Sequence, residues 1–175
     1  MTRKTVEGSQ DYFAVTFVDR YGPSLVAKDC PLRCGSGHMW LGRHWDSSDR
    51  SFREAVRAHI REYAVAESSI YSSVQRARML TGMFFGGVET LILRDERVRR
   101  AVLLAEGLGA ISQSDSDELN TETGVVNVAT NTSRPADPAR DNFTAVWNVA
   151  DIRKNAAFFP VCQRFVEMLD RAGNS

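Results

Sequence analysis

The stretch DSSDRSFREAVRAHIREYAVAE, residues 46–67, constrains the fold more than any other part of the chain. Its bulky apolar side chains recur every three to four residues, which places them along one side of an α-helix. These side chains are Phe52, Val56, Ile60 and Tyr63. Because such a helix is stable only when its apolar side is covered, the stretch predicts a helix lying on a hydrophobic core.

Further helices are predicted after it. We expect a second helix over residues 68–83 and a third over residues 88–106. Gly86 and Gly87 lie between these ranges, and glycine is unfavourable inside a helix, so the break is expected there. Residues 142–175 return to a helical pattern with one apolar face.

The first 45 residues predict β structure instead. In YFAVTFV (12–18), Phe13 and Phe17 belong to an apolar–polar alternation with the two-residue period of a strand. SLVAK (24–28) and HMWLGRHW (38–45) are predicted as two more short strands. We therefore expect an α+β fold that is predominantly helical, with a small N-terminal antiparallel β element followed by a helical body of about four to five helices.

Residues 111–141 have a different composition from the rest. They are rich in Ser, Thr, Asn, Asp and Pro, which predicts a long polar loop or linker holding one short strand at GVVNVA (124–129). At 175 residues the chain fits one compact domain. Its expected parts are a β-rich element (1–45), an Arg-rich helical segment (46–110), the polar loop (111–141) and C-terminal helices (142–175).

The charges are unevenly distributed although the net charge is zero. Residues 50–100 carry ten Arg against six acidic residues, whereas residues 101–175 carry six basic and ten acidic residues. The planar guanidinium of Arg suits phosphate and carboxylate groups. The first helix places several arginines along the side opposite its apolar stripe, and others follow in the third helix. The predicted nucleic-acid or partner-binding residues are Arg53, Arg57, Arg61, Arg97 and Arg100.

The same arginines have two other interpretations. They can form a solvated helix face with intrahelical ion pairs, as in a chain whose GC-rich codons favour Arg. They can also bind the acidic C-terminal half of a neighbouring protomer. All three interpretations stay open on the sequence alone.

The segment CPLRCGSGHMWLGRH (30–44) predicts a metal site or a plain loop. Cys30, Cys34, His38 and His44 are the residue types that bind structural zinc, although their spacing departs from the usual pairs. The alternative is a glycine-rich loop with a buried cysteine or two. No other cofactor is expected.

No complete catalytic motif occurs in the chain. An enzyme would need a site assembled from dispersed residues, for which the candidates are Cys34, His38, His44, His59, Asp46 and Asp49. A third class is a protein-interaction inhibitor or immunity-type module that uses the acidic C-terminal half.

Together these patterns favour a non-enzymatic binding or assembly protein. Its Arg-rich helical surface would engage nucleic acid, RNA or DNA, or a neighbouring protomer in a homo-oligomer. Size and composition suit a viral or phage accessory or coat-type protein. The N-terminus lacks the apolar segment of a secretory signal, so a cytoplasmic, intracellular protein without a membrane partner is expected.

Overall fold

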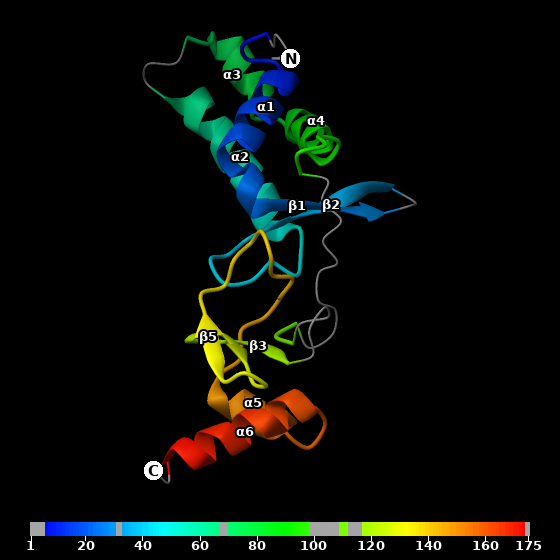
Figure 1. Ribbon diagram of the computed structural model, residues 1–175. Helices are drawn as coiled ribbons and strands as arrows, with labels where there is room; N and C mark the ends of the chain where they lie inside the picture. The colour runs from blue at the N-terminus through cyan, green and yellow to red at the C-terminus, as the bar shows by residue number, and fades with distance from the viewer. Residues whose placement is uncertain (1–5, 31–32, 67–69, 99–108, 112–116, 174–175) are drawn as a thin grey trace. The chain divides into compact units, whose positions relative to one another are not determined.

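The computed structural model describes residues 6–30, 33–66, 70–98, 109–111 and 117–173 (Figure 1). The fold is α+β, with six α-helices and two antiparallel sheets in this part of the chain. No described helix is both long enough and apolar enough to cross a bilayer. The chain divides into two compact units, unit 1 with Met1–Met39 and Ser48–Ala101, and unit 2 with Trp40–Ser47 and Val102–Ser175.

Unit 1 is a helical body with one β-hairpin. Each of its helices α1, α3 and α4 begins at a hydroxyl residue, Ser9, Ser72 or Thr81, whose side chain accepts a hydrogen bond from the first turn. Its elements in chain order are α1 (Gln10–Tyr21), the 3-10 turn η1 (Gly22–Ser24), β1 (Leu25–Cys30), β2 (Arg33–Met39), α2 (Arg50–Val65), α3 (Ser73–Met79) and α4 (Gly82–Leu93).

The predicted strand at residues 12–18 is wrong, because these residues belong to α1. Its buried residues are Phe13, Ala14, Phe17 and Val18, which recur in the four-residue rhythm of a helix. Phe13 and Phe17 fit both a two-residue and a four-residue period, so the alternation was ambiguous. The pair Ala14 and Val18, buried beside them, is what distinguishes the helix.

The N-terminal antiparallel β element is confirmed as the β1–β2 hairpin. The strand predicted at residues 24–28 corresponds to β1, which pairs with β2 from Leu25 opposite Met39. The strand predicted at residues 38–45 is wrong beyond Met39, where β2 ends. Gly37 in β2 lies against α2, since a Cβ there would come within 2.6 Å of the Phe52 ring.

The helix predicted within residues 46–67 is confirmed as α2, and Phe52, Val56 and Ile60 are buried as expected. The predicted break at Gly86–Gly87 is wrong, because α4 runs through both glycines. The break lies instead at Thr81, which caps α4. The predicted continuation of this helix to residue 106 fails at Leu93, where α4 ends, and residues 99–106 lie outside the described residues.

Gly87 has a packing role instead. A Cβ at this position would come within 2.1 Å of the Gln10 side-chain nitrogen, so the glycine allows α1 and α4 to approach each other closely. Gln10 then donates to the backbone carbonyl of Phe84 at 3.3 Å. The core of unit 1 lies between α1, α2 and α4 and includes Phe13, Phe17, Phe52, Val56, Ile60, Phe84, Val88 and Ile92.

Unit 2 combines a small sheet with two helices, β3 (Glu118–Thr121), β4 (Gly124–Asn127), β5 (Thr132–Arg134), α5 (Val149–Asn155) and α6 (Pro160–Gly173). The C-terminal helices are confirmed. The segment 111–141 is not simply a loop, since it contains all three strands of an antiparallel sheet ordered β3–β4–β5. Only the strand at 124–129 was predicted, and it corresponds to β4.

Candidate nucleic-acid interface

Arg53, Arg57 and Arg61 form one exposed row on α2, which we call the arginine face. Successive members are four residues apart, so they lie about 6 Å apart along the helix axis. The opposite side of α2 is buried in the core of unit 1. The burial of that apolar side therefore fixes the arginine face toward solvent, as the sequence predicted.

The three guanidinium groups have different surroundings. The Arg53 Nη2 atom lies 2.6 Å from the Asp49 Oδ2 atom, which is one of the intrahelical pairs that the solvated-face interpretation expected. The guanidinium of Arg57 lies over the ring of Phe85 in α4, 6.0 Å from its centroid. Within the described part of the chain, Arg57 and Arg61 make no ion pair. Two of the three cations are thus available to an external anion.

Glu89 of α4 is the carboxylate that partly offsets the arginine face. It is half-buried, and burial raises its pKa, while the positive charges of Arg53 and Arg57 act in the opposite direction. Asp49 adds a smaller upward contribution. Glu89 therefore competes with any external anion for Arg53 and Arg57.

Arg97 is held by carboxylates and stands apart from the arginine face. Its guanidinium donates to Asp95 at 2.8 Å and to Asp19 of α1 at 2.5 Å. These hydrogen bonds raise the pKa of Arg97 above its usual range. Arg97 joins α1 to the turn that follows α4. Arg100 lies outside the described residues.

The predicted zinc ligands are distributed over both units. Cys30 is in β1 and Cys34 is in β2, and only their backbones are described. His38 in β2 is buried, with its Nε2 atom 3.0 Å from the Ser36 Oγ atom, whereas His44 belongs to unit 2. No group of three or more metal-binding side chains occurs among the residues that the structure describes. Zinc binding at these four residues stays a prediction.

The glycine-rich loop that was the alternative to zinc is wrong for most of the segment. Gly35 and Gly37 lie within β2, where they take part in the hairpin. Gly42 alone of the three has a positive φ, +90°, and it lies in the short connection after the hairpin. Two of the three glycines therefore serve a strand rather than a turn.

The dispersed catalytic candidates also fall into separate units. His59 is buried among aromatic rings in unit 1, with its Nε2 atom 3.0 Å from the Thr16 Oγ1 atom, and burial lowers its pKa. Asp49 is paired with Arg53. His44 and Asp46 are in unit 2, where burial lowers the pKa of His44 and the Asp46 charge opposes that effect.

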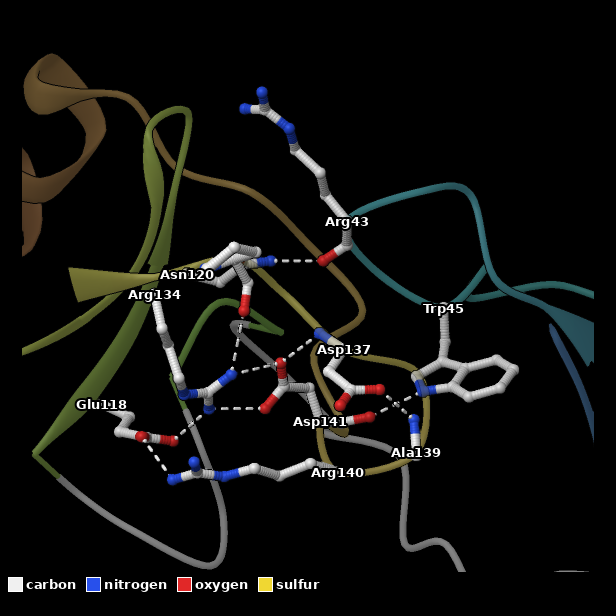
Figure 2. Close-up of polar contacts among 10 residues, drawn as sticks. Arg43, Trp45, Glu118, Asn120, Arg134, Asp137, Ala139, Arg140 and Asp141 are labelled. Carbon is white, nitrogen blue, oxygen red and sulfur yellow. Dashed lines mark hydrogen bonds and ion pairs between the residues drawn. The ribbon is translucent and has the colours of Figure 1, made fainter. Parts of the chain in front are cut away.

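Sequence reasoning missed a charged cluster in unit 2, shown in Figure 2, which we call the carboxylate–arginine cluster. Arg134 of β5 donates two hydrogen bonds to Asp141, at 2.8 and 2.7 Å, and one to Glu118 of β3 at 3.0 Å. Arg140 donates to the other oxygen of Glu118 at 2.9 Å. Glu118 and Asp141 are both buried. The cluster joins the sheet to the loop that follows it.

Two further buried groups hold the segment Trp40–Ser47 inside unit 2 (Figure 2). The side-chain amide of Asn120 donates to the carbonyl oxygens of Arg43 and Ala145, both at 2.9 Å. The indole of Trp45 donates to the carbonyl oxygen of Asp141 at 2.7 Å. The buried polar residues of β3 thus organise this unit, and their polarity is why the sequence suggested a loop.

Comparison with known proteins gives no relative for this chain. No protein-family model matches it, and no curated protein or solved structure matches it either. Function is therefore argued from the residues themselves.

Proposed function

We propose that the protein binds nucleic acid through the arginine face of α2 and acts as a non-enzymatic binding or assembly protein. The observation that supports this most is the row of three exposed guanidinium groups at one-turn spacing, two of them without an ion pair among the described residues. Like charges four residues apart repel by a few tenths of a kcal/mol. An anionic partner along the helix removes that repulsion.

A phosphate backbone suits this face better than a single small anion does. The three arginines extend over nine residues, about 12 Å from the first to the last along the helix, so they can contact several phosphates of one strand at once. The Phe85 ring beside Arg57 favours a fixed position of that guanidinium through a cation–π interaction. A guanidinium held in place loses less side-chain entropy when it binds phosphate.

The test is the affinity for fluorescently labelled single-stranded RNA and duplex DNA, measured by anisotropy in low salt. The double variant Arg57→Glu with Arg61→Glu is expected to bind at least about tenfold more weakly than the wild type. The matched control is Arg153→Glu with Arg171→Glu, which makes the same charge change on exposed positions of α5 and α6.

The proposal is overturned if the wild type binds neither nucleic acid in low salt. It is also overturned if the two double variants bind nucleic acid equally. A protein that binds no nucleic acid but loses its oligomeric mass in the Arg57→Glu, Arg61→Glu variant would instead assign the arginine face to a neighbouring protomer. Circular dichroism of each variant checks that the helices remain folded.

A further inference from the structure

Exposed apolar side chains gather at one end of unit 1. Nine large apolar residues are exposed in the described part of the chain, and six of them belong to residue 6 and residues 65–83. Met83 is 87% exposed and Val74 is 76% exposed. Single exposed apolar residues are ordinary, but a gathering of them marks an interaction surface. The six residues are Val6, Val65, Ile70, Val74, Leu80 and Met83.

Packing brings together the segments that carry these residues. Gly8 and Ser9, which precede α1, line a cavity of about 330 Å³ together with Gln75 and Arg78 of α3 and Phe84 of α4. The segment before α1, the helix α3 and the start of α4 therefore meet, and Figure 1 shows α3 beside the first turn of α1. The end of α2 packs against α3. We call this surface the α3 end.

The α3 end carries both signs of charge among its apolar residues. Glu7 and Arg78 are exposed, and neither makes an ion pair within the described residues. Residues 65–66 and 70–88 contain no acidic side chain, so the carboxylates among the described residues at this end are Glu7, before α1, and Asp11, in its first turn. Arg76 of α3 is half-buried and makes no ion pair within the described residues either. An apolar surface that carries unpaired charges of both signs can complement a copy of itself.

We propose that the α3 end is the interface of a two-fold homodimer. In a two-fold interface each contact occurs twice with the roles exchanged. Glu7 of one copy then pairs with Arg78 of the other copy, and the reverse pair forms symmetrically, while Val74 and Met83 become buried. The carboxylate of Glu7 disfavours an anionic lipid surface, and the apolar side chains disfavour nucleic acid as the occupant. A second copy satisfies both features.

This inference goes beyond the proposed function and does not depend on it. A dimer formed at the α3 end would carry two copies of the arginine face in one particle. Two linked binding surfaces raise the apparent affinity for a long polyanion through effective concentration. Dimerisation is nevertheless measured without nucleic acid, so the failure of either proposal leaves the other intact.

The experiment is mass determination by light scattering after size exclusion, over a wide range of protein concentration. The wild type is expected at twice the 19.5 kDa chain mass. Glu7→Arg alone and Arg78→Glu alone are each expected to be monomeric, since each places like charges opposite one another in both symmetric pairs. An equimolar mixture of these two variants is expected to dimerise, because every pair then joins opposite charges.

An apolar variant and a control complete the design. Met83→Glu is expected to be monomeric. Phe158→Ser changes an exposed apolar residue in the connection between α5 and α6 of unit 2, and this variant is expected to remain dimeric. A monomeric wild type at all concentrations overturns the proposal. So does a dimer whose mass is unchanged by Met83→Glu, or a mixture of the two charge variants that stays monomeric.

Discussion

The carboxylate–arginine cluster gives the sharpest stability prediction, for the substitution Asp141→Asn. The Asp141 carboxylate is 2% exposed and accepts two hydrogen bonds from Arg134 and one from the backbone nitrogen of Asp137, at 2.7 Å. An amide of the same shape keeps the volume and removes the charge. It also turns a donor toward the guanidinium or the backbone nitrogen, where only acceptors fit.

The expected cost follows from what Arg134 retains. Removing one partner of a buried ion pair costs about 3–5 kcal/mol. Arg134 is 23% exposed and keeps its bond to Glu118, so the lower end of that range applies. We therefore expect Asp141→Asn to lower the free energy of unfolding of unit 2 by about 3 kcal/mol.

The chain contains its own reporter for this measurement. Trp40, Trp45 and Trp147 all belong to unit 2, and the four tyrosines all belong to unit 1. Tryptophan fluorescence during urea unfolding therefore follows unit 2 alone. A loss of about 3 kcal/mol moves the urea midpoint down by about 2 M for a unit of this size.

Asp170→Asn is the matched control. It makes the same chemical change at a carboxylate that is 56% exposed and paired with an exposed Arg153, for which a cost of at most about 0.5 kcal/mol is expected. Equal midpoints for Asp141→Asn and Asp170→Asn would refute the reasoning that burial makes this cluster important.

Three further predictions concern unit 1. Because burial lowers the pKa of His59, the unfolded chain gains a proton near pH 6.5 before the folded one does, so unit 1 is expected to lose stability below that pH by at most about 1.4 kcal/mol per pH unit. His59→Gln should flatten this dependence in tyrosine-monitored melting, and an unchanged slope would contradict the assignment. Glu89→Gln should tighten nucleic-acid binding, since it removes the carboxylate that competes for Arg53 and Arg57; weaker or equal binding in anisotropy would count against that role. Gly37→Ala should cost about 1–3 kcal/mol in thermal unfolding, because its Cβ would overlap the adjacent aromatic ring, and a variant as stable as the wild type would show that the hairpin can shift.

The elements that the sequence predicted well are those with one strong local signal. The helix α2 has a clean apolar stripe, and its burial pattern follows from helical spacing alone. Helix α1 was missed because Phe13 and Phe17 satisfy two periods at once, and the choice between them depends on packing against α4. Gly87 was read as a helix break because its close approach to α1 is a tertiary contact.

The sheet of unit 2 was not predicted in full, because its contacts are tertiary as well. Its strands are only three or four residues long, and its buried positions include Glu118 and Asn120. Such residues usually indicate a loop, and here they are buried because Arg134 and the carbonyl oxygens of Arg43 and Ala145 satisfy them. These partners are distant in sequence, so no local pattern reveals them.

The arginine face could be predicted in part. Helical spacing places Arg53, Arg57 and Arg61 on one exposed side, which is confirmed. The Phe85 ring and the Glu89 carboxylate that modify this face come from α4 and required the structure. The same holds for Arg97, which a carboxylate on α1 holds in place.

The most direct test of the central claim is the salt dependence of nucleic-acid binding by the wild type. Arg57 and Arg61, the two arginines of this face without an ion pair among the described residues, predict a slope of log K against log salt of about −1.8 on duplex DNA and about −1.4 on a single strand. The duplex value corresponds to a loss of about 12-fold in affinity between about 50 and about 200 mM salt. The Arg57→Glu, Arg61→Glu variant should show a slope close to zero. Binding that does not depend on salt, or a variant with the slope of the wild type, would contradict the account.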